Sequence, residues 1–580
     1  MAIVDSITAE VIRCGLETIA DEMGITMMHT SRTPIFTETH DFSTAIFDAQ
    51  GRMAALAQAI PIHMGAMKYA VQAAMDFFGS EEIYEGDLIL VNDPYYGGSH
   101  IPDWTMFAPT FYQGELVLFP AVRAHMADTG GAIGGGYNPA AYEIWQEGLR
   151  LSPIKIYEKG KPRRDILKML EINNRMPTFM GDLQAMIGSN MIGKRRIMEF
   201  LEKYGREAVA DSLEYVYDYA ERRFRAEIRE WPDGIYEGEA FIEHDGQGTR
   251  DIRIHAHITI EGDEITVDMS GSDPQVPGFI NSSLANVYSW VYVSFCCMID
   301  PDIPKNDGLF RPVNLIAPKG TIVNPQEPAP CTACTLHVGG EIAEAVAHAM
   351  AQAVPGKAFN QNFKIGIPII TQGINPRTGD YFIDLNLDNM GGSCNAAYGV
   401  DAWGITPPVL AAITSTSVEM TDLLFPTRHH GWEYTTDSGG PGKWRGVCGP
   451  WSNKEALAHI KATYFIIANR FPMRGLNGGG TGGLARYVLR HGSPQEMILE
   501  EVGVDEPLEP GHFYYTQYPG GGGWGDPLER RPELVREDVL DEYVSIEGAR
   551  RDYGVIIDPE RLEIDITATE TLRRQMKSQE

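Results

Sequence analysis

The stretch Gly86-Asp-Leu-Ile-Leu-Val-Asn-Asp-Pro-Tyr-Tyr-Gly-Gly-Ser-His-Ile-Pro-Asp103 joins a predicted strand to a polar loop. Its opening residues are largely apolar, which predicts the strand, and the loop that follows carries His100 and Asp103. Residues 116–122 predict another strand, which leads directly to His125. Because each polar group follows the end of a strand, we expect the three side chains to converge.

Imidazole nitrogens and carboxylate oxygens are the ligands that hold Zn, Mn or Fe in sites left open to water. Water bound to such an ion becomes a nucleophile near neutral pH, which favours hydrolysis or a related attack on carbon. From residue types alone, a metal site and a polar loop in which Asp103 satisfies His100 are equally good interpretations. Asp41, which precedes a predicted strand at residues 42–47, is a weaker candidate, because such an Asp is often a cap or turn residue.

Composition excludes several classes of function. The chain has 580 residues, enough for two to four domains. Its formal net charge is -31, whereas nucleic-acid binding requires a cluster of basic residues, so we do not expect a nucleic-acid partner. We expect neither a secretory signal nor a membrane span, because the chain start and the rest of the sequence lack the apolar runs that these need. Seven sparsely spread cysteines fit a reducing compartment, so we expect a cytoplasmic protein.

The sequence patterns predict a multidomain α+β fold. A mixed α/β metal-binding domain is expected over residues 1–229, with helices at both of its ends. At Trp231-Pro-Asp-Gly234 the apolar pattern changes to a period of two, which predicts a β-rich domain over residues 230–527 with a helix at 343–353. Residues 528–580 are predicted to form a C-terminal helical segment.

Glycine-rich clusters punctuate the β-rich region. They are Gly391-Gly392, Gly439-Gly-Pro-Gly442, Gly478-Gly-Gly-Thr-Gly-Gly483 and Gly520-Gly-Gly-Gly523. None has the Gly-x4-Gly-Lys-Ser/Thr pattern of a P-loop, since Lys443 is followed by Trp. We interpret the clusters as tight turns between strands, and any use of ATP must then come from another subunit.

Two smaller motifs have a metal interpretation and a simpler one. Cys331-Thr-Ala-Cys334 could bind zinc, but a second such pair is missing, so we favour buried thiols. His255-Ala-His257 places both rings on one face of a predicted strand, and we favour a solvated face over a metal site.

Several segments together resemble the hydantoinase B/oxoprolinase family, and they follow the family's order along essentially the whole chain. These segments are Thr39-His-Asp-Phe-Ser-Thr-Ala-Ile-Phe-Asp-Ala-Gln-Gly51, Gln58-Ala-Ile-Pro-Ile-His-Met-Gly65, Asn92–Asp103 within the stretch quoted first, Glu147-Gly-Leu-Arg-Leu151, Asp437-Ser-Gly-Gly-Pro-Gly-Lys-Trp-Arg-Gly446 and Pro519-Gly-Gly-Gly-Gly-Trp-Gly-Asp526.

The resemblance implies a ligand set for one divalent metal ion. In related carboxylases an Asp, then His-x2-Asp, then His hold the ion, and these positions fall here on Asp41, His100, Asp103 and His125. Zn or Mn is the expected metal and Fe is a further candidate, because mixed nitrogen and oxygen ligands discriminate weakly.

Three further residues are candidates for catalytic or supporting roles. His63 could orient a ligand or accept a proton, although a packing histidine is as good an interpretation. Asp128 and Glu147 are candidates for the same reasons, and Glu147 could simply anchor its loop.

The resemblance also implies a function and a partner. The chain would be the B-type (beta) subunit of an ATP-dependent cyclic-amide hydrolase that acts on hydantoins, lactams or 5-oxoproline-like rings. An A-type (alpha) subunit of the actin/Hsp70-like ATPase superfamily would use ATP and Mg to phosphorylate the substrate's carbonyl oxygen, in an A2B2 assembly. The alternative is the large subunit of an ATP-dependent acetone- or acetophenone-type carboxylase, and a third is a scaffold without catalysis.

The length of the chain favours the hydrolase, because the large subunits of acetone carboxylases are longer. Ring size, ring substituents, metal identity and subunit count stay open. Ile35, Phe36, Tyr137 and Trp145 are candidates for the wall of the substrate pocket.

Overall fold

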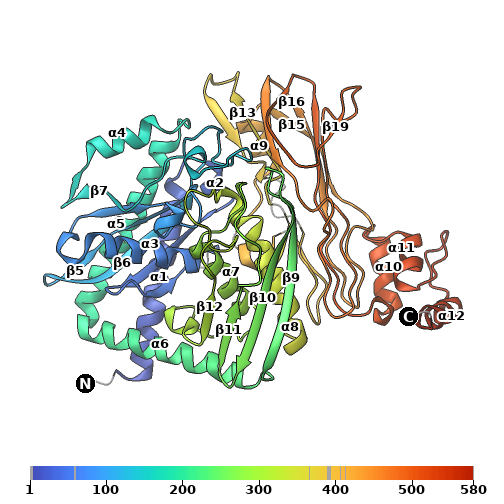
Figure 1. The fold of residues 1–580 in the computed structure, drawn as a ribbon, viewed down its shortest axis with the longest axis horizontal. Helices are drawn as coiled ribbons and strands as arrows, with labels where there is room; N and C mark the ends of the chain where they lie inside the picture. Colours follow the sequence, from blue (N-terminus) through green and yellow to red (C-terminus); the bar gives the residue numbers. More distant parts are fainter. Residues whose placement is uncertain are drawn as a thin grey trace.

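A computed structural model describes residues 4–57, 60–364, 366–387, 393–404, 406–411 and 413–578. Gln58 and the Gly391-Gly392 pair, which the sequence motifs include, lie outside the described residues. The described chain forms helices and four separate sheets, which confirms the predicted α+β class (Figure 1).

The N-terminal sheet carries the chemistry-bearing loops. Its eight strands follow the order β2-β1-β6-β4-β3-β7-β8, with β5 also paired to β6. The strands are β1 (Phe42–Asp48), β2 (Met53–Leu56), β3 (Leu88–Val91), β4 (Asp103–Phe107), β5 (Thr110–Tyr112), β6 (Glu115–His125), β7 (Ile154–Glu158) and β8 (Lys161–Pro162). The strands predicted at residues 42–47, 86–91 and 116–122 are confirmed.

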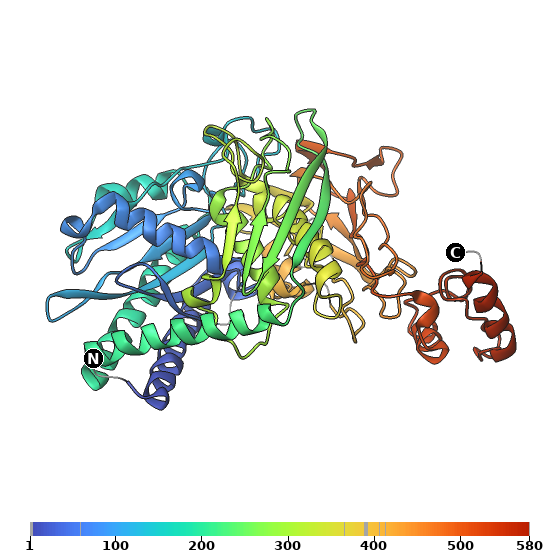
Figure 2. The ribbon, with the colours of Figure 1, turned by 60° about the horizontal axis from the view of Figure 1, so that its bottom comes forward.

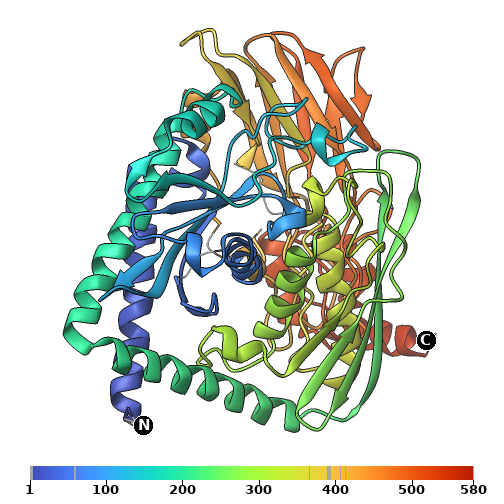
Figure 3. The ribbon, with the colours of Figure 1, turned by 60° about the vertical axis from the view of Figure 1, so that its left-hand side comes forward.

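Long helices cover this sheet. The Asp5 carboxylate caps α1 by accepting hydrogen bonds from two backbone N–H groups, and the apolar face of α1 packs on α5, α6 and β1. Figure 3 shows α1 and α5 side by side along one edge, with α6 running along the bottom. The helices of this part are α1 (Ser6–Thr30), α2 (Pro34–Thr37), α3 (His63–Phe78), α4 (Arg164–Ile172), α5 (Phe179–Tyr204) and α6 (Arg206–Arg229).

A second sheet has the order β12-β11-β10-β9, and α8 packs against its β9 and β10 strands. Helix α7 contacts both α3 and α8 and so joins this layer to the N-terminal sheet. A hairpin turn at Gly262-Asp263 joins β10 to β11. The elements are β9 (Gly234–His244), β10 (Arg250–Glu261), β11 (Glu264–Asp268), β12 (Val313–Ile316), α7 (Leu284–Cys296) and α8 (Val338–Ala353).

Two further sheets complete the β-rich region, with orders β14-β13-β17-β20 and β15-β16-β21-β18-β19. The third sheet consists of β13 (Ile369–Ile374), β14 (Tyr381–Asp384), β17 (Ile460–Phe465) and β20 (Val502–Leu508). The fourth consists of β15 (Thr427–Tyr434), β16 (Pro450–Ala456), β18 (Arg486–Leu489), β19 (Met497–Ile498) and β21 (Phe513–Gln517), and α9 (Val418–Leu424) packs beside β15.

The glycine clusters pack backbone against backbone, and the prediction of tight turns is wrong for most of them. Among their described glycines only Gly478 has a positive φ, so the left-handed backbone of many tight turns is largely missing. Instead, the Gly440 N–H donates to the Gly521 carbonyl at 2.7 Å, and a Cβ at Gly482 would collide with the carbonyl oxygen of Gly520. Glycine is needed here because neighbouring backbones approach more closely than a side chain allows.

One continuous apolar core runs from α1 to the segment that contains Trp524. The C-terminal helices α10 (Pro532–Leu540), α11 (Ile546–Tyr553) and α12 (Ile566–Lys577) have a small core of their own around Val535 and Tyr553, and they project from the body (Figures 1 and 2). The domain boundaries at residues 229 and 527 stay predictions. No helix among the described residues combines the length and apolar character needed to cross a bilayer.

Candidate metal centre

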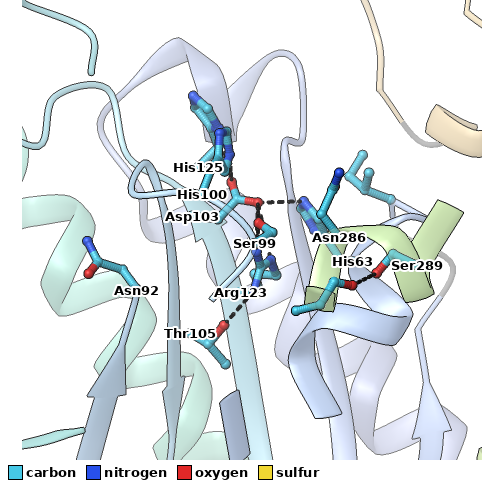
Figure 4. Close-up of polar contacts among 12 residues, drawn as sticks. His63, Asn92, Ser99, His100, Asp103, Thr105, Arg123, His125, Asn286 and Ser289 are labelled. Atoms are coloured by element: carbon cyan, nitrogen blue, oxygen red, sulfur yellow. Dashed lines mark hydrogen bonds and ion pairs between the residues drawn. The ribbon is translucent and has the colours of Figure 1, made fainter. Parts of the chain in front are cut away.

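Strand register brings the candidate ligands together. Strand β4 begins at Asp103 and β6 ends at His125, and these two residues face each other in the antiparallel pair. His100 lies in the loop that leads into β4. Candidate ligand atoms of the three residues lie within 4.8 Å of one another, and theirs is the only such group among the residues that the structure describes (Figure 4). The predicted convergence is confirmed.

A backbone carbonyl fixes the orientation of His100. Its Nδ1 lies 2.7 Å from the carbonyl oxygen of Thr332, which can only accept a hydrogen bond, so Nδ1 carries the proton. The unprotonated Nε2 then lies 3.0 Å from Oδ1 of Asp103. This is the arrangement of a metal-binding histidine, with one nitrogen held by the protein and the other free to donate its lone pair.

Asp103 is kept ionised although it is buried. Burial alone would raise the pKa of Asp103, but its polar surroundings, among them the Arg123 guanidinium, outweigh burial and hold that pKa well below its ordinary value. Oδ2 of Asp103 accepts hydrogen bonds from Arg123 at 2.9 Å and from Ser99 at 3.1 Å. Oδ1 faces the two histidines, since it also lies 3.0 Å from Nδ1 of His125.

The donor set fits a divalent ion. Ligand atoms bonded to one ion at about 2.0–2.2 Å lie about 3 Å apart, which matches the spacing between Asp103 and each histidine. Nε2 of His125 is buried and has no hydrogen-bond partner among the described residues. Two imidazoles and one carboxylate are a set that Zn, Mn and Fe all accept.

Asp41 lies at the same cavity but outside this three-residue group. Its backbone carbonyl accepts the His125 N–H at 3.1 Å, and the preceding His40 has a left-handed φ of 56°. Its carboxylate Oδ1 lies 3.9 Å from Nε2 of His63, and burial raises the pKa of Asp41 to about 6. Asp41 as the fourth ligand therefore stays a proposal.

His63, the first residue of α3, lines the same cavity, and Figure 4 shows His63 and His125 on either side of Asp103. Its Nδ1 lies 2.9 Å from the Ser43 hydroxyl, and its Nε2 lies 3.7 Å from Oδ2 of Asp103. Burial lowers the pKa of His63 to about 3, so the ring is neutral near pH 7. A neutral imidazole in this place can accept a proton.

Asp128 and Glu147, the other two catalytic candidates, are not among the described residues that line the cavity. Asp128 accepts hydrogen bonds from the backbone N–H of Arg175 at 2.8 Å and from its guanidinium at 3.0 Å, which anchors the loop after His125. Glu147 accepts the backbone N–H groups of Cys331 at 2.9 Å and Thr332 at 2.8 Å. We propose positioning roles for both residues.

The Cys331-Thr-Ala-Cys334 and His255-Ala-His257 motifs lie outside the candidate metal group. Cys331 and Cys334 are buried thiols, and the Cys334 thiol lies 3.4 Å from the Ser99 carbonyl oxygen, beside the ligand loop. The His257 ring pairs with Glu237 at 3.1 Å on a polar strand face. Neither motif belongs to a group of candidate ligands among the described residues.

The cavity wall is mostly different from the predicted one. Tyr137 lines it and stacks on His125 with ring centroids 5.9 Å apart, whereas Ile35, Phe36 and Trp145 are not among its described lining residues. The aliphatic wall comes from Ile60, Ile62, Leu336, Ile367, Leu410 and Ile413. Sequence reasoning also missed Arg123, although strand alternation places residues two apart, here Arg123 and His125, on one face.

Comparisons with known proteins identify relatives of this chain. The beta chain of the caprolactamase of Pseudomonas jessenii is 38% identical over 574 residues, which cover 96% of this chain and 97% of that protein. The putative B-type component of a D-/L-hydantoinase of Pseudomonas sp. (strain NS671) is 30% identical, with 98% of each chain covered. The crystal structure of the ATP-dependent caprolactamase from Pseudomonas jessenii contains a chain that is 36% identical, with a TM-score of 0.90 and coverage of 98% of this chain and 100% of that one. Residues 5–527 match the model of the hydantoinase B/oxoprolinase family, to which this chain therefore belongs.

Proposed function

We propose that this chain is the metal-bearing beta subunit of an ATP-dependent cyclic-amide hydrolase. A partner ATPase of the actin/Hsp70-like superfamily would phosphorylate the carbonyl oxygen of the ring amide, in an A2B2 assembly, and this chain would open the activated ring. The convergence of His100, Asp103 and His125 at the buried cavity carries the proposal. The likeness to the caprolactamase beta chain over nearly the whole sequence supports it.

His100, Asp103 and His125 would hold the ion, with Asp41 as the proposed fourth ligand. A divalent ion there supplies Lewis acidity, which makes water a better nucleophile near neutral pH. The protein's own contribution is to fix the ligands: Thr332 orients His100, and Arg123 with Ser99 keeps the Asp103 carboxylate in place. Tyr137 packs against both histidine rings and limits their rotation.

The proposed step is addition of water to the phosphorylated amide. The water oxygen forms a bond to the imidate carbon, and His63 Nε2 takes the proton that water loses. The ring nitrogen receives that proton. The C–N bond then breaks as the proton of the newly added hydroxyl moves to the same nitrogen, which leaves an amine and an acyl phosphate. A second water hydrolyses this acyl phosphate to a carboxylate and inorganic phosphate. Hydrolysis of one ATP thus accompanies the opening of one ring and the use of two water molecules.

The second candidate is the large subunit of a ketone carboxylase, which would join a phosphorylated enol to a carbon from bicarbonate. Its expected metal ligands fall on the same four residues of this chain. The 38% identity to the caprolactamase chain favours hydrolysis.

Co-expression of this chain with its A-type ATPase subunit tests the proposal. The purified assembly is supplied with ATP and either a lactam, hydantoin, or acetone with bicarbonate. We expect ring opening that depends on ATP and on both subunits. A product that forms only from acetone with bicarbonate would refute the hydrolase function and support the carboxylase function.

A further inference from the structure

The cavity of the candidate metal centre has a polar side and an apolar side. The polar residues of its described lining are Asp41, His63, His100, Asp103, His125, Tyr137 and Thr335. Its apolar side consists of Ile60, Ile62, Leu336, Ile367, Leu410 and Ile413, none of which is more than 8% exposed. This division suits a ring that has one polar edge, where the amide lies, and methylene groups elsewhere.

No described residue that lines the cavity is a lysine or an arginine. The residues outside the described ranges do not include one either, because they consist only of Met, Ala, Ile, Gln, Asp, Asn, Gly and Glu. The nearby Arg123 is fully buried, and its guanidinium donates to Asp103, to Ser99 and to Thr105 at 3.0 Å. The described lining of this cavity therefore offers no free cation to a negatively charged substituent.

A carboxylate on the ring would be poorly tolerated in this cavity. The amide edge, with its phosphoryl group, belongs at the polar side beside the candidate ligands. A ring carboxylate would then face aliphatic side chains such as Leu410 and Ile413. Burial of an unpaired charge among apolar groups is strongly unfavourable.

We infer, on the basis of the function proposed above, that this chain selects uncharged rings: it opens lactams that carry no ionised substituent and rejects ring carboxylates such as 5-oxoproline. The apolar wall is the specificity determinant, and the metal ligands contribute to the chemistry common to all substrates.

A matched pair of substrates tests this inference. 2-Pyrrolidinone and 5-oxoproline share one five-membered lactam ring and differ only in the carboxylate. With the two-subunit enzyme, both the ring-opened product and the ADP released are measured. We expect kcat/KM for ring opening to be at least ~100-fold higher for 2-pyrrolidinone, and 5-oxoproline to release ADP without ring opening. If 5-oxoproline gives neither ADP nor ring-opened product, the selection lies in the partner and the inference is overturned.

Two variants test the wall directly. Leu410→Lys and Ile413→Lys each add a cation to the apolar side. We expect either variant to open 5-oxoproline faster than the parent enzyme does, and so to lower the ratio of the two kcat/KM values at least ~10-fold. Two positions are used because one buried lysine could prevent folding, and melting temperature and metal content check this. Leu423→Lys, the same change at a side chain that is 66% exposed, serves as the control and keeps the preference.

Two outcomes separate this inference from the proposed function. If the parent enzyme opens both rings with equal kcat/KM, the inference is overturned and the hydrolase function stands. If no lactam is opened under any condition, the proposed function falls and the inference falls with it.

Discussion

The carbonyl oxygen of Thr332 lies 2.7 Å from Nδ1 of His100, although 232 residues separate them in sequence. The contact links the N-terminal sheet, whose loop carries His100, to the turn before α8. Glu147 stabilises that turn by accepting the N–H groups of Cys331 and Thr332. The β-rich half of the chain thus sets the orientation of a ligand that belongs to the N-terminal half.

We predict that Glu147→Gln weakens metal binding by about 10–100-fold without removing a ligand. A glutamine can accept only one of the two N–H groups and turns its own N–H2 toward the other, so the Thr332 carbonyl loses its position. Competition with a chelator measures the affinity. Glu81→Gln, at an exposed position, is the control, and unchanged affinity in Glu147→Gln would refute the link from Glu147 to His100.

We expect His100→Ala and Asp103→Ala to lose the metal. Each change removes one of three neighbouring ligand atoms, and the remaining two bind a divalent ion too weakly to retain it during purification. Elemental analysis of the purified proteins gives the metal content. His257→Ala, on a polar strand face, should keep full content. Full metal occupancy in either ligand variant would contradict the assignment.

His63→Gln should keep the metal and lose activity. Its Nε2 lies near Asp103 and Asp41 without belonging to the ligand group, and a proton acceptor contributes about 10²–10⁴-fold to the rate. We therefore expect kcat to fall by that factor at unchanged metal content. A parallel loss of metal would instead make His63 a ligand, and unchanged kcat would exclude it as the proton acceptor.

Local patterns were enough to predict the strands that end at the site. Apolar runs before His100 and His125 predict β3 and β6, and antiparallel register then places Asp103 opposite His125. The partners of these ligands were harder to predict. Thr332 has no pattern that distinguishes it, because its role depends on a backbone carbonyl that only the tertiary fold brings to His100.

The glycine clusters show a different limit of sequence reasoning. Glycine permits both a left-handed turn and a close approach of two backbones, and composition does not separate the two. Close approach depends on which distant segments meet, as with Gly440 and Gly521. The apolar wall was missed for a similar reason, since its six residues come from four separate segments that have no common motif.

The buried pair of Glu341 and Lys364, 2.8 Å apart, gives a pH-dependent prediction. Burial outweighs Lys364 and raises the pKa of Glu341 to about 7, against about 4.5 in the unfolded chain. The folded state thus binds this proton more tightly, so the contribution of Glu341 to stability is full below pH ~4.5 and is lost as the pH rises through 7. The amplitude is roughly 3 kcal/mol, since each unit between the two pKa values is worth about 1.4 kcal/mol.

Glu341→Gln should therefore flatten the decline in stability between pH 5 and 7, because glutamine has no proton to lose in this range. Denaturant unfolding across this pH range, at constant metal content, measures the slope of stability against pH. Glu261→Gln, at an exposed strand end, should keep the slope of the parent protein. An unchanged slope in Glu341→Gln would show that other groups cause the decline.

The packed glycine clusters predict an unusually large cost for a single methyl group. A Cβ at Gly482 would meet the carbonyl oxygen of Gly520, and a Cβ at Gly521 would meet that of Cys394, so a backbone segment must move in either case. We expect Gly482→Ala and Gly521→Ala to lower the free energy of unfolding by about 1–3 kcal/mol or more, as overpacking does. Gly356→Ala is the matched control, because its φ is not positive and a Cβ there would meet no atom within 4 Å. Thermal unfolding compares the three variants. Equal melting temperatures would show that the clusters accommodate side chains, and that their glycines serve some purpose other than close backbone packing.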